Sequence, residues 1–444
     1  MQLNPHPRFP FMPSQERTLQ ILFTLFIFVG GFFGFNLMLS ILYGSDLYLI
    51  AGIFTPAYRT IFLAIGILAI LNYIMDPKLK APAELIFILA IFWGLYGLRI
   101  VIDGWILKEI LRMPPTEYVM RAFGITAIPM IAFWRPISPQ MNRRILVGIF
   151  ITLWLTTFIS IITYKSYFGE SYRSLQYKEG IDAATLISPL ILSYNGSISI
   201  SLGVWAFFNY HKQSISKAIF LLSLILIGLI TIYIGASRGA FIACGIILLL
   251  LLYTQAKTKP IARSFLYVAF LLLISIVAIY ILDASGSSIS ERITGLIEEI
   301  KYMERGAGGG RLNLWINALS QFANDPLIGS GLEEEESLFY PHNHIIEAFM
   351  TTGVLGGFCF IALSIWAWRA AIKILMQYPQ LGWISVVYIN FFIAGLFSSP
   401  IIRAELWYSI IAVIAAERSI RQIQPQNKPH YSIKRYQSSH YSKA

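Results

Sequence analysis

Six side chains stand out because their chemistry is costly in or beside apolar sequence. They are four arginines and two histidines: Arg173, Arg238, Arg311, Arg403, His342 and His344. A charge near a bilayer centre costs about 2.5–3.5 kcal/mol on insertion scales, so each is a candidate for function. The guanidinium fork matches phosphate oxygens and stays charged at any relevant pH. Several arginines meeting in one cavity would therefore bind a diphosphate, whereas a single one could simply reach the membrane interface.

The two histidines lie just before a long apolar run. An imidazole titrates near neutral pH, so His342 or His344 could be a general base, although a histidine hydrogen-bonded at a helix start is the ordinary structural alternative. The pair could also bind a metal together with Glu333–Glu336. However, side chains two residues apart diverge by about 200° around a helix, and four consecutive glutamates are typical of a solvated loop. We expect no metal and no cofactor.

The elements that position these residues must be membrane helices. Hydrophobic residues make up 56% of the chain and charged residues only 13%, so a water-soluble fold could not bury the apolar surface. A helix crosses about 30 Å of hydrocarbon with about 20 apolar residues. We predict an all-α integral membrane protein with about 12 spans. They are expected near 18–42, 54–75, 84–102, 117–134 (which contains Arg121), 145–166, 187–208, 217–235, 239–254, 264–282, 344–367, 380–398 and 402–416.

Loop charges predict the orientation of these spans. If the N-terminus is internal, nearly all loop lysines and arginines are internal, and such residues accumulate on the cytoplasmic side. The internal residues would be Lys78, Lys80, Arg135, Arg143, Arg144, Lys212, Lys217, Lys257, Lys259, Arg263, Arg369 and Lys373. Both termini are therefore predicted to be cytoplasmic. The net charge of +11 is explained by topology, and we predict no nucleic-acid partner.

The predicted organisation has five parts. They are a cytoplasmic segment 1–17, spans 1–9 within 18–282, an external loop 283–343, spans 10–12 within 344–416, and a basic cytoplasmic tail 417–444. Cys244 and Cys359 both lie in apolar runs, so no disulfide framework is expected.

The large external loop has helical periodicity of its own. Residues 288–304 and the stretch RLNLWINALSQFAND at 311–325 are both amphipathic, and a glycine-rich stretch at 306–310 separates them. We predict two amphipathic helices lying over the membrane face. The apolar face expected for the second one consists of Leu312, Trp315, Leu319 and Phe322.

The motifs around these residues resemble the bacterial O-antigen ligase family. His342-Asn343, nine residues and Gly353-Val354-Leu355-Gly356 fit that family's His-[Asn/Ser/Gln]-x9-Gly-x-x-Gly signature. RLNLWINALSQFANDPLIGSGL is similar to the family's stretch in which an Arg and a Trp precede Asn/Asp-Pro-Leu-Ile-Gly-x-Gly. GASRGAF around Arg238 is similar to its small-Ser-Arg-Gly segment. The resemblance covers residues 235–356, and the layout of the helices with one large loop agrees.

The resemblance implies roles for individual residues. Arg238 and Arg311 would bind the donor diphosphate, and His342 would activate the acceptor hydroxyl. Asn343, His344, Arg173 and Arg403 are possible supports of the site. A second histidine at position 344 departs from the family pattern, so the assignment of the base to His342 depends on the register of the motif.

The function implied is that of an O-antigen ligase in the bacterial inner (cytoplasmic) membrane, with its site on the periplasmic face. It would transfer a glycan from undecaprenyl diphosphate to a hydroxyl of lipid A-core, completing lipopolysaccharide. Arginines for the leaving diphosphate and a histidine base suffice without a metal, and direct displacement inverts the anomeric centre. Alternatives are an O-antigen polymerase or a protein O-oligosaccharyltransferase with the same donor. A lipid-linked glycan transporter is disfavoured because no internal repeat is visible.

Overall fold

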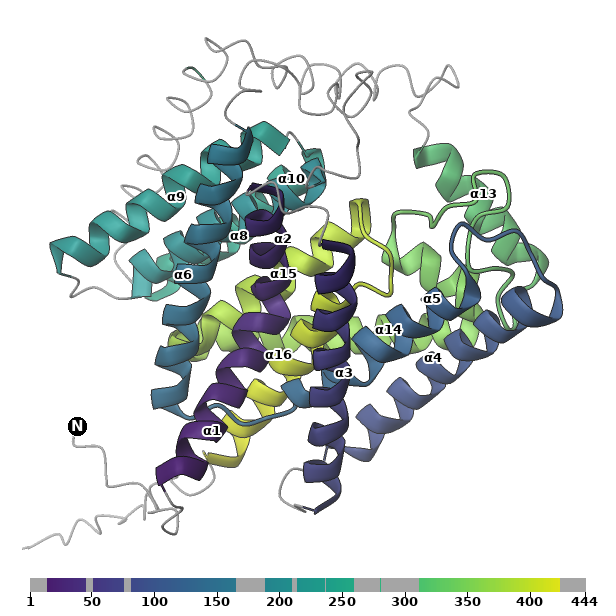
Figure 1. Ribbon diagram of the computed structural model, residues 1–444, viewed down its shortest axis with the longest axis horizontal. Coiled ribbons are helices and arrows are strands. Elements are labelled where there is room, and N and C mark those ends of the chain that lie inside the picture. The colour runs from purple at the N-terminus through teal and green to yellow at the C-terminus, as the bar shows by residue number, and fades with distance from the viewer. Residues whose placement is uncertain are drawn as a thin grey trace, which may run out of the picture.

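The computed structural model describes residues 14–44, 51–75, 81–164, 188–209, 214–235, 237–258, 280 and 311–423 (Figure 1). Every regular element in these ranges is helical, and β-pairing within them is limited to an isolated bridge between Glu334 and Phe339. Several predictions fall outside the described residues. They concern Arg173, the span 264–282 apart from Tyr280, the helix 288–304, the glycine-rich stretch 306–310 and the end of the tail from residue 424.

The described helices occur in the following order along the chain. The first rod consists of α1 (Ser14–Leu25), π-helical η1 (Phe26–Gly34) and α2 (Phe35–Gly44). It is followed by α3 (Ala51–Met75), α4 (Ala83–Val101), η4 (Ile102–Ile106), α5 (Pro115–Val119), η5 (Met120–Ala127), η6 (Pro129–Phe133) and α6 (Pro139–Tyr164). The remaining elements are α8 (Pro189–Asn209), α9 (Ile215–Gly235), α10 (Arg238–Thr258), α13 (Arg311–Asn324), α14 (His344–Gln377), η10 (Pro379–Leu381), α15 (Gly382–Phe397) and α16 (Ala404–Ile423).

Nine helical stretches in the described part of the chain are long and apolar enough to cross a membrane. Each overlaps one predicted span. They are Gln20–Leu42, Gly52–Met75, Ala83–Ile106, Pro139–Thr163, Leu190–Asn209, Ile215–Gly235, Arg238–Lys257, His344–Gln377 and Pro379–Phe397. The all-helical membrane architecture is therefore confirmed, whereas the count of twelve stays a prediction.

The predicted span 117–134 is wrong as a continuous helix. The chain turns there through α5, the π-helical η5 and the 3-10 helix η6. Pro129 has no N–H to continue a helical ladder, so η5 ends before it and a tighter turn begins. Arg121 lies in the π-helical η5 and lines a cavity.

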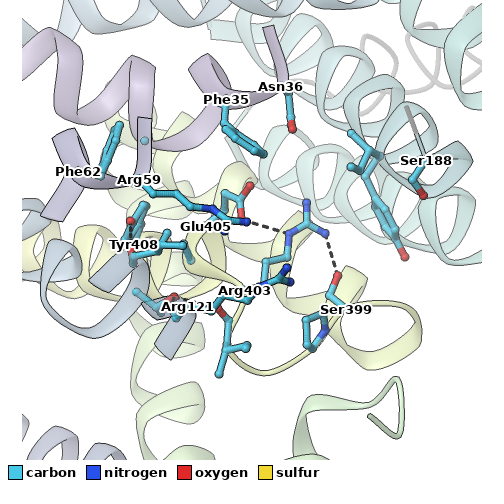
Figure 2. A pocket seen from close by; sticks show the side chains of 18 of the residues that line it. Phe35, Asn36, Arg59, Phe62, Arg121, Ser188, Ser399, Arg403, Glu405 and Tyr408 are labelled. Carbon is cyan, nitrogen blue, oxygen red and sulfur yellow. Dashed lines mark hydrogen bonds and ion pairs between the residues drawn. The ribbon is translucent and has the colours of Figure 1, made fainter. Parts of the chain in front are cut away.

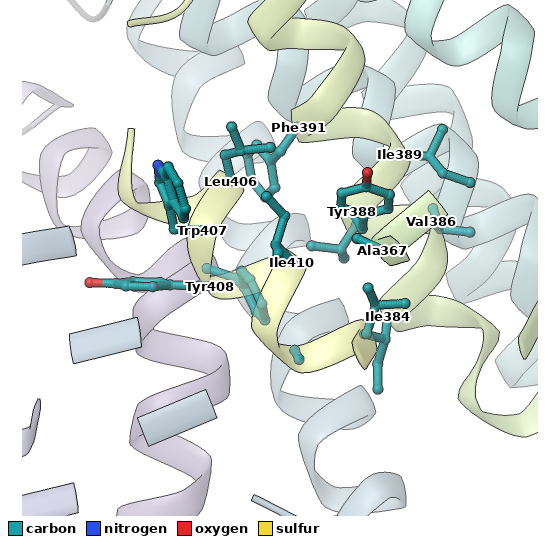
Figure 3. Close-up of a cluster of buried hydrophobic side chains, with 14 of the residues drawn as sticks. Ala367, Ile384, Val386, Tyr388, Ile389, Phe391, Leu406, Trp407, Tyr408 and Ile410 are labelled. Atoms are coloured by element: carbon teal, nitrogen blue, oxygen red, sulfur yellow. The ribbon is translucent and has the colours of Figure 1, made fainter. Parts of the chain in front are cut away.

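Helix α16 occupies the predicted span 402–416 but is not among the nine apolar stretches. It is instead a buried central helix. Leu406, Trp407 and Ile410 pack with Phe391 of α15, and the cluster continues to Ala367 of α14 (Figure 3). The three helices α14, α15 and α16 thus form the core against which the other elements pack.

The two described ends of the chain lie at the same end of the bundle. The start of α1 and the last turn of α16 both reach the lower edge of Figure 1. There the guanidinium of Arg135 lies 5.9 Å from the ring of Phe23, and that of Arg418 lies 5.9 Å from the ring of Trp134. Lys373 pairs with Glu417 at 2.7 Å. Their side of the membrane stays a prediction.

Candidate functional site

A cavity of about 380 Å³ lies between α2, α3, η5, the start of α8 and the turn 398–403 that joins α15 to α16 (Figure 2). Its polar wall carries Arg59, Arg121 and Arg403, together with a single carboxylate, Glu405. Aromatic rings such as that of Phe62 form the apolar wall. Three arginines outnumber two carboxylates, Glu405 in the wall and Glu117 bonded to Arg59 and Arg121, and this excess of positive charge favours an anionic ligand.

The cavity arginines are held by carboxylates at its rim. Arg59 Nη1 donates to Glu117 Oε1 at 3.0 Å, and Arg121 Nε donates to the same oxygen at 2.7 Å. Arg403 donates to Glu405 at 3.3 Å and to the Ser399 hydroxyl at 2.8 Å (Figure 2). These bonds orient the three guanidinium groups. The cavity wall keeps an excess of positive charge, because three arginines share two carboxylates.

Sequence reasoning missed Arg59 and Arg121 as site residues. Their positions in the sequence could have identified them, because each lies inside a stretch predicted to span the membrane, where a charge is costly. Arg403, predicted as a possible support, does line the cavity.

Tyr340 connects the cavity to His342. It lines the cavity, and its ring centroid lies 4.4 Å from that of the His342 imidazole, at an angle of 62°. Burial, and then the Glu347 carboxylate, raise the pKa of Tyr340 to about 12, against the opposing charges of Arg403, Arg112 and Arg311. The phenol therefore stays neutral near pH 7, and the electrostatic effect of Arg311 and Arg403 extends to the neighbourhood of His342.

Helix α13 begins at Arg311 and is hydrogen-bonded to the residue that precedes His342. Arg311 and Trp315 lie one turn apart and therefore on the same face of the helix. Trp315 Nε1 donates to the Pro341 carbonyl at 2.8 Å, next to His342. The Arg and Trp of the sequence motif thus act together, because the indole anchors the face that carries the guanidinium.

The predicted amphipathic helix 311–325 is confirmed as α13. Of the predicted apolar face, Phe322 contacts Phe349 of α14 with 5.4 Å between ring centroids, whereas Leu319 is 47% exposed. The fully buried residues of the helix are Leu314, Ala318 and Gln321.

Arg238 begins α10 next to the cavity wall. The N–H of Ser237 donates to the Ser193 hydroxyl at 3.0 Å, and Gly239 packs against the hydroxyl of Tyr194, which lines the cavity. Arg238 itself is not part of that lining. A direct approach of Arg238 to Arg311 stays a prediction.

The structure distinguishes the two histidines clearly. His342 is half-buried and precedes α14, whereas His344 is fully buried and begins it. The ring of His344 packs against Gly395, and its Nε2 lies 3.0 Å from the Pro400 carbonyl. One turn further on, Glu347 Oε2 accepts from the Ile401 N–H at 2.8 Å. His344 thus contacts the turn that carries Arg403 and is not among the residues that line the cavity.

Asn343 is the N-cap residue of α14. Its Oδ1 accepts from the N–H groups of Ile345 at 3.0 Å and Ile346 at 3.2 Å, so it caps the N-terminus of α14. Asn and Ser are both good N-cap residues, which gives a physical reason for their occurrence at this position of the motif.

The glycine motif marks a break in α14. Gly353 has φ 66° and ψ −169°, a conformation that side chains disfavour. The break frees main-chain groups for the loop 325–343: the Val354 N–H donates to Pro326 at 2.8 Å, and the Ser330 N–H donates to Met350 at 2.8 Å. A Cβ at Gly353 would lie 2.2 Å from the Leu327 carbonyl oxygen. The stretch Asn-Asp-Pro-Leu-Ile-Gly-Ser-Gly before His342 and the glycine motif after it are therefore joined by main-chain contacts, which we call the main-chain joint.

A buried ion pair holds the same loop to α4. Arg99 pairs with Asp103 and donates from Nη1 to the Gly329 carbonyl at 2.9 Å, while Asp103 Oδ2 accepts from the Leu332 N–H at 2.8 Å. Gly329 itself has φ 82° and packs on the main chain of α14. Sequence reasoning did not predict this pair.

The acidic run Glu333–Glu336 is only partly solvated, contrary to expectation. Glu333 and Glu334 are buried. Glu333 accepts from the Arg112 N–H at 2.9 Å and from the Tyr118 hydroxyl, while Glu334 accepts from the Ser337 N–H at 2.8 Å. These carboxylates shape the loop. No group of three or more His, Cys, Asp or Glu residues that could hold a metal occurs among the described residues.

Fold and site together define a multi-pass helical membrane protein with an arginine-lined cavity close to a half-buried histidine. A family model described as O-Antigen ligase matches residues 221–361, the region that contains Arg238, Arg311, His342 and the glycine motif. The match confirms, over this region, the resemblance to the O-antigen ligase family that was inferred from the motifs. No curated protein matches the chain.

Proposed function

We propose that the chain is an O-antigen ligase of the bacterial inner membrane. It moves a glycan from undecaprenyl diphosphate to a hydroxyl of lipid A-core on the periplasmic face, without a metal and with inversion at the anomeric carbon. The observation that carries the proposal is the arginine-lined cavity, whose wall residue Tyr340 contacts the imidazole of His342.

In this proposal the arginines bind the donor. The diphosphate lies against Arg403 and is reached by Arg311 and Arg238 from the loop side. Rings of the apolar wall, such as Phe35 and Phe62, accommodate the start of the lipid chain. Guanidinium groups suit this ligand because paired donors match phosphate oxygens, and charge–charge attraction is strong in a partly buried site.

His342 acts on the acceptor. Its imidazole removes the proton from the acceptor hydroxyl while the hydroxyl oxygen forms a bond to the anomeric carbon. The bond from that carbon to the diphosphate oxygen breaks, and undecaprenyl diphosphate leaves with the electron pair. The arginines stabilise the added negative charge on the leaving group. Attack opposite the leaving group inverts the configuration.

The test is reconstitution with defined lipids. Purified protein is mixed with undecaprenyl-diphosphate glycan and lipid A-core in the presence of a chelator, and the products are separated by gel. Capped lipopolysaccharide is expected. Elongated donor glycan in place of capped product would identify a polymerase, and absence of transfer to either lipid would contradict the proposal.

A further inference from the structure

The imidazole of His342 belongs to a stack that the proposed reaction does not use. Its centroid lies 5.0 Å from that of the Phe339 ring, with 27° between the ring planes. The guanidinium carbon of Arg112 lies 4.0 Å from the centroid of the same phenyl ring. A cation over an aromatic face and a second ring stacked on that aromatic are both favourable arrangements.

Two hydrogen bonds hold the segments that carry Arg112 and Phe339. Glu333 accepts from the backbone N–H of Arg112 at 2.9 Å, which ties the segment before α5 to the loop 325–343. The Glu334 N–H donates to the Phe339 carbonyl at 2.9 Å and closes the turn that carries the phenyl ring. Arg112 and Phe339 are therefore held in register by hydrogen bonds of their backbone groups to Glu333 and Glu334, independently of the ring contact itself.

His342 is held in an unusual backbone conformation at the end of the stack. Its φ is 58°, in the left-handed region that residues other than glycine seldom adopt. Such a conformation persists only where the surroundings hold it. The hydrogen bond from Trp315 to Pro341 holds the preceding residue, and Phe339 and Tyr340 confine the ring.

We propose that Arg112 and Phe339 are positioning residues for His342. The phenyl ring fixes the plane of the imidazole, and the guanidinium holds the phenyl ring while adding a positive charge beside the base. The proposal rests on the proposed function in taking His342 as the base. Neither residue touches the substrates; each acts through the orientation and protonation of the imidazole.

The charge of Arg112 favours the neutral imidazole, which is the form that accepts a proton. A nearby cation disfavours a second positive charge. The other charges near this ring pair, which act on the neighbouring Tyr340, are Arg311 of α13, Arg403 of the turn 398–403 and the opposing Glu347 of α14. When Arg112 is removed, we expect the acid limb of the pH–rate profile to move to higher pH.

The first experiment measures transfer by Phe339→Leu, Arg112→Gln and Arg112→Lys. We expect Phe339→Leu and Arg112→Gln to lower kcat about tenfold while the donor KM stays within about twofold, because the donor site is untouched. Arg112→Lys should keep the acid limb of the wild type, since it keeps the charge. Arg144→Gln, at an exposed position on α6, is the matched control and should be unchanged.

A second measurement needs no turnover. Diethyl pyrocarbonate acylates neutral, accessible imidazoles, and mass spectrometry reads each histidine separately. Phe339→Leu should raise the acylation rate of His342 several-fold, and Arg112→Gln should raise the pH midpoint of that reaction, while buried His344 serves as the internal reference.

The two measurements separate the two proposals. If the wild type transfers nothing but the acylation rate and midpoint shift as expected, the stack is supported and the proposed function fails. If the wild type is active and both variants match it in kcat, acylation rate and midpoint, Arg112 and Phe339 do not position His342 and the stack proposal is wrong.

Discussion

The loop 325–343, which carries His342, and the turn 398–403, which carries Arg403, are both held by helix α14 but in different ways. The loop is joined by main-chain hydrogen bonds at the break around Gly353. The turn is held by two buried side chains, His344 and Glu347. A joint made of main chain needs glycine, and so it is visible in the sequence as a motif. A joint made of distant side chains leaves no local pattern.

The largest expected effect is that of His342→Ala, which tests whether the loop carries the base. Transfer should fall by about 10²–10⁴, the usual contribution of a general base, while donor affinity stays near that of the wild type. Single-turnover rates and donor binding would be measured side by side. Loss of donor binding, or an active variant, would take the base away from the loop.

Arg311→Lys and Arg403→Lys test whether the loop side and the turn side both bind the diphosphate. We expect each to weaken donor binding about tenfold or more, because lysine presents one compact charge in place of a planar fork. Titration of each variant with undecaprenyl diphosphate would measure this change in affinity. If one variant binds normally, the diphosphate is held from one side alone.

Gly353→Ala tests the main-chain joint. The added Cβ would meet the Leu327 carbonyl, and the left-handed φ would be strained, so the loop should be displaced and transfer reduced about tenfold, with lower thermal stability. Gly245→Ala in α10 is the control, because no atom lies within 4 Å of its added Cβ. Equal behaviour of the two variants would refute the joint.

His344→Ala tests the side-chain joint and should be milder than His342→Ala. It removes the contact with Pro400 and the packing on Gly395, so the turn that carries Arg403 should loosen. We expect the donor KM to rise several-fold with a smaller change in kcat. A loss of kcat as large as that of His342→Ala, with KM unchanged, would make His344 the base instead.

Trp315→Phe should give the smallest effect. It removes one hydrogen bond to the Pro341 carbonyl, worth about 1 kcal/mol, and keeps most of the ring packing. Transfer should fall about fivefold, as that energy implies, with an unchanged fold by circular dichroism. Wild-type activity would show that α13 does not need this bond to hold the loop beside His342.

Sequence reasoning succeeded where the constraint is local. Nine predicted spans match helices because lipid requires long uninterrupted apolar runs. It failed at 117–134, where hydropathy alone could not show that the chain would change from π-helix to 3-10 helix at Pro129. It also did not predict that Leu314, Ala318 and Gln321 would be the fully buried residues of α13, because α14, on which this helix packs, follows it across a loop.

The sequence by itself determined that the chain lies in the membrane, where the glycine motif stands, and which histidine has the register of the family motif. Only the tertiary structure decided which charges share a cavity. Arg59, Arg121 and Arg403 meet because α3, η5 and the turn 398–403 converge. The spacing of these arginines in the sequence does not indicate that they are close in space, since helix packing rather than local conformation brings the side chains together.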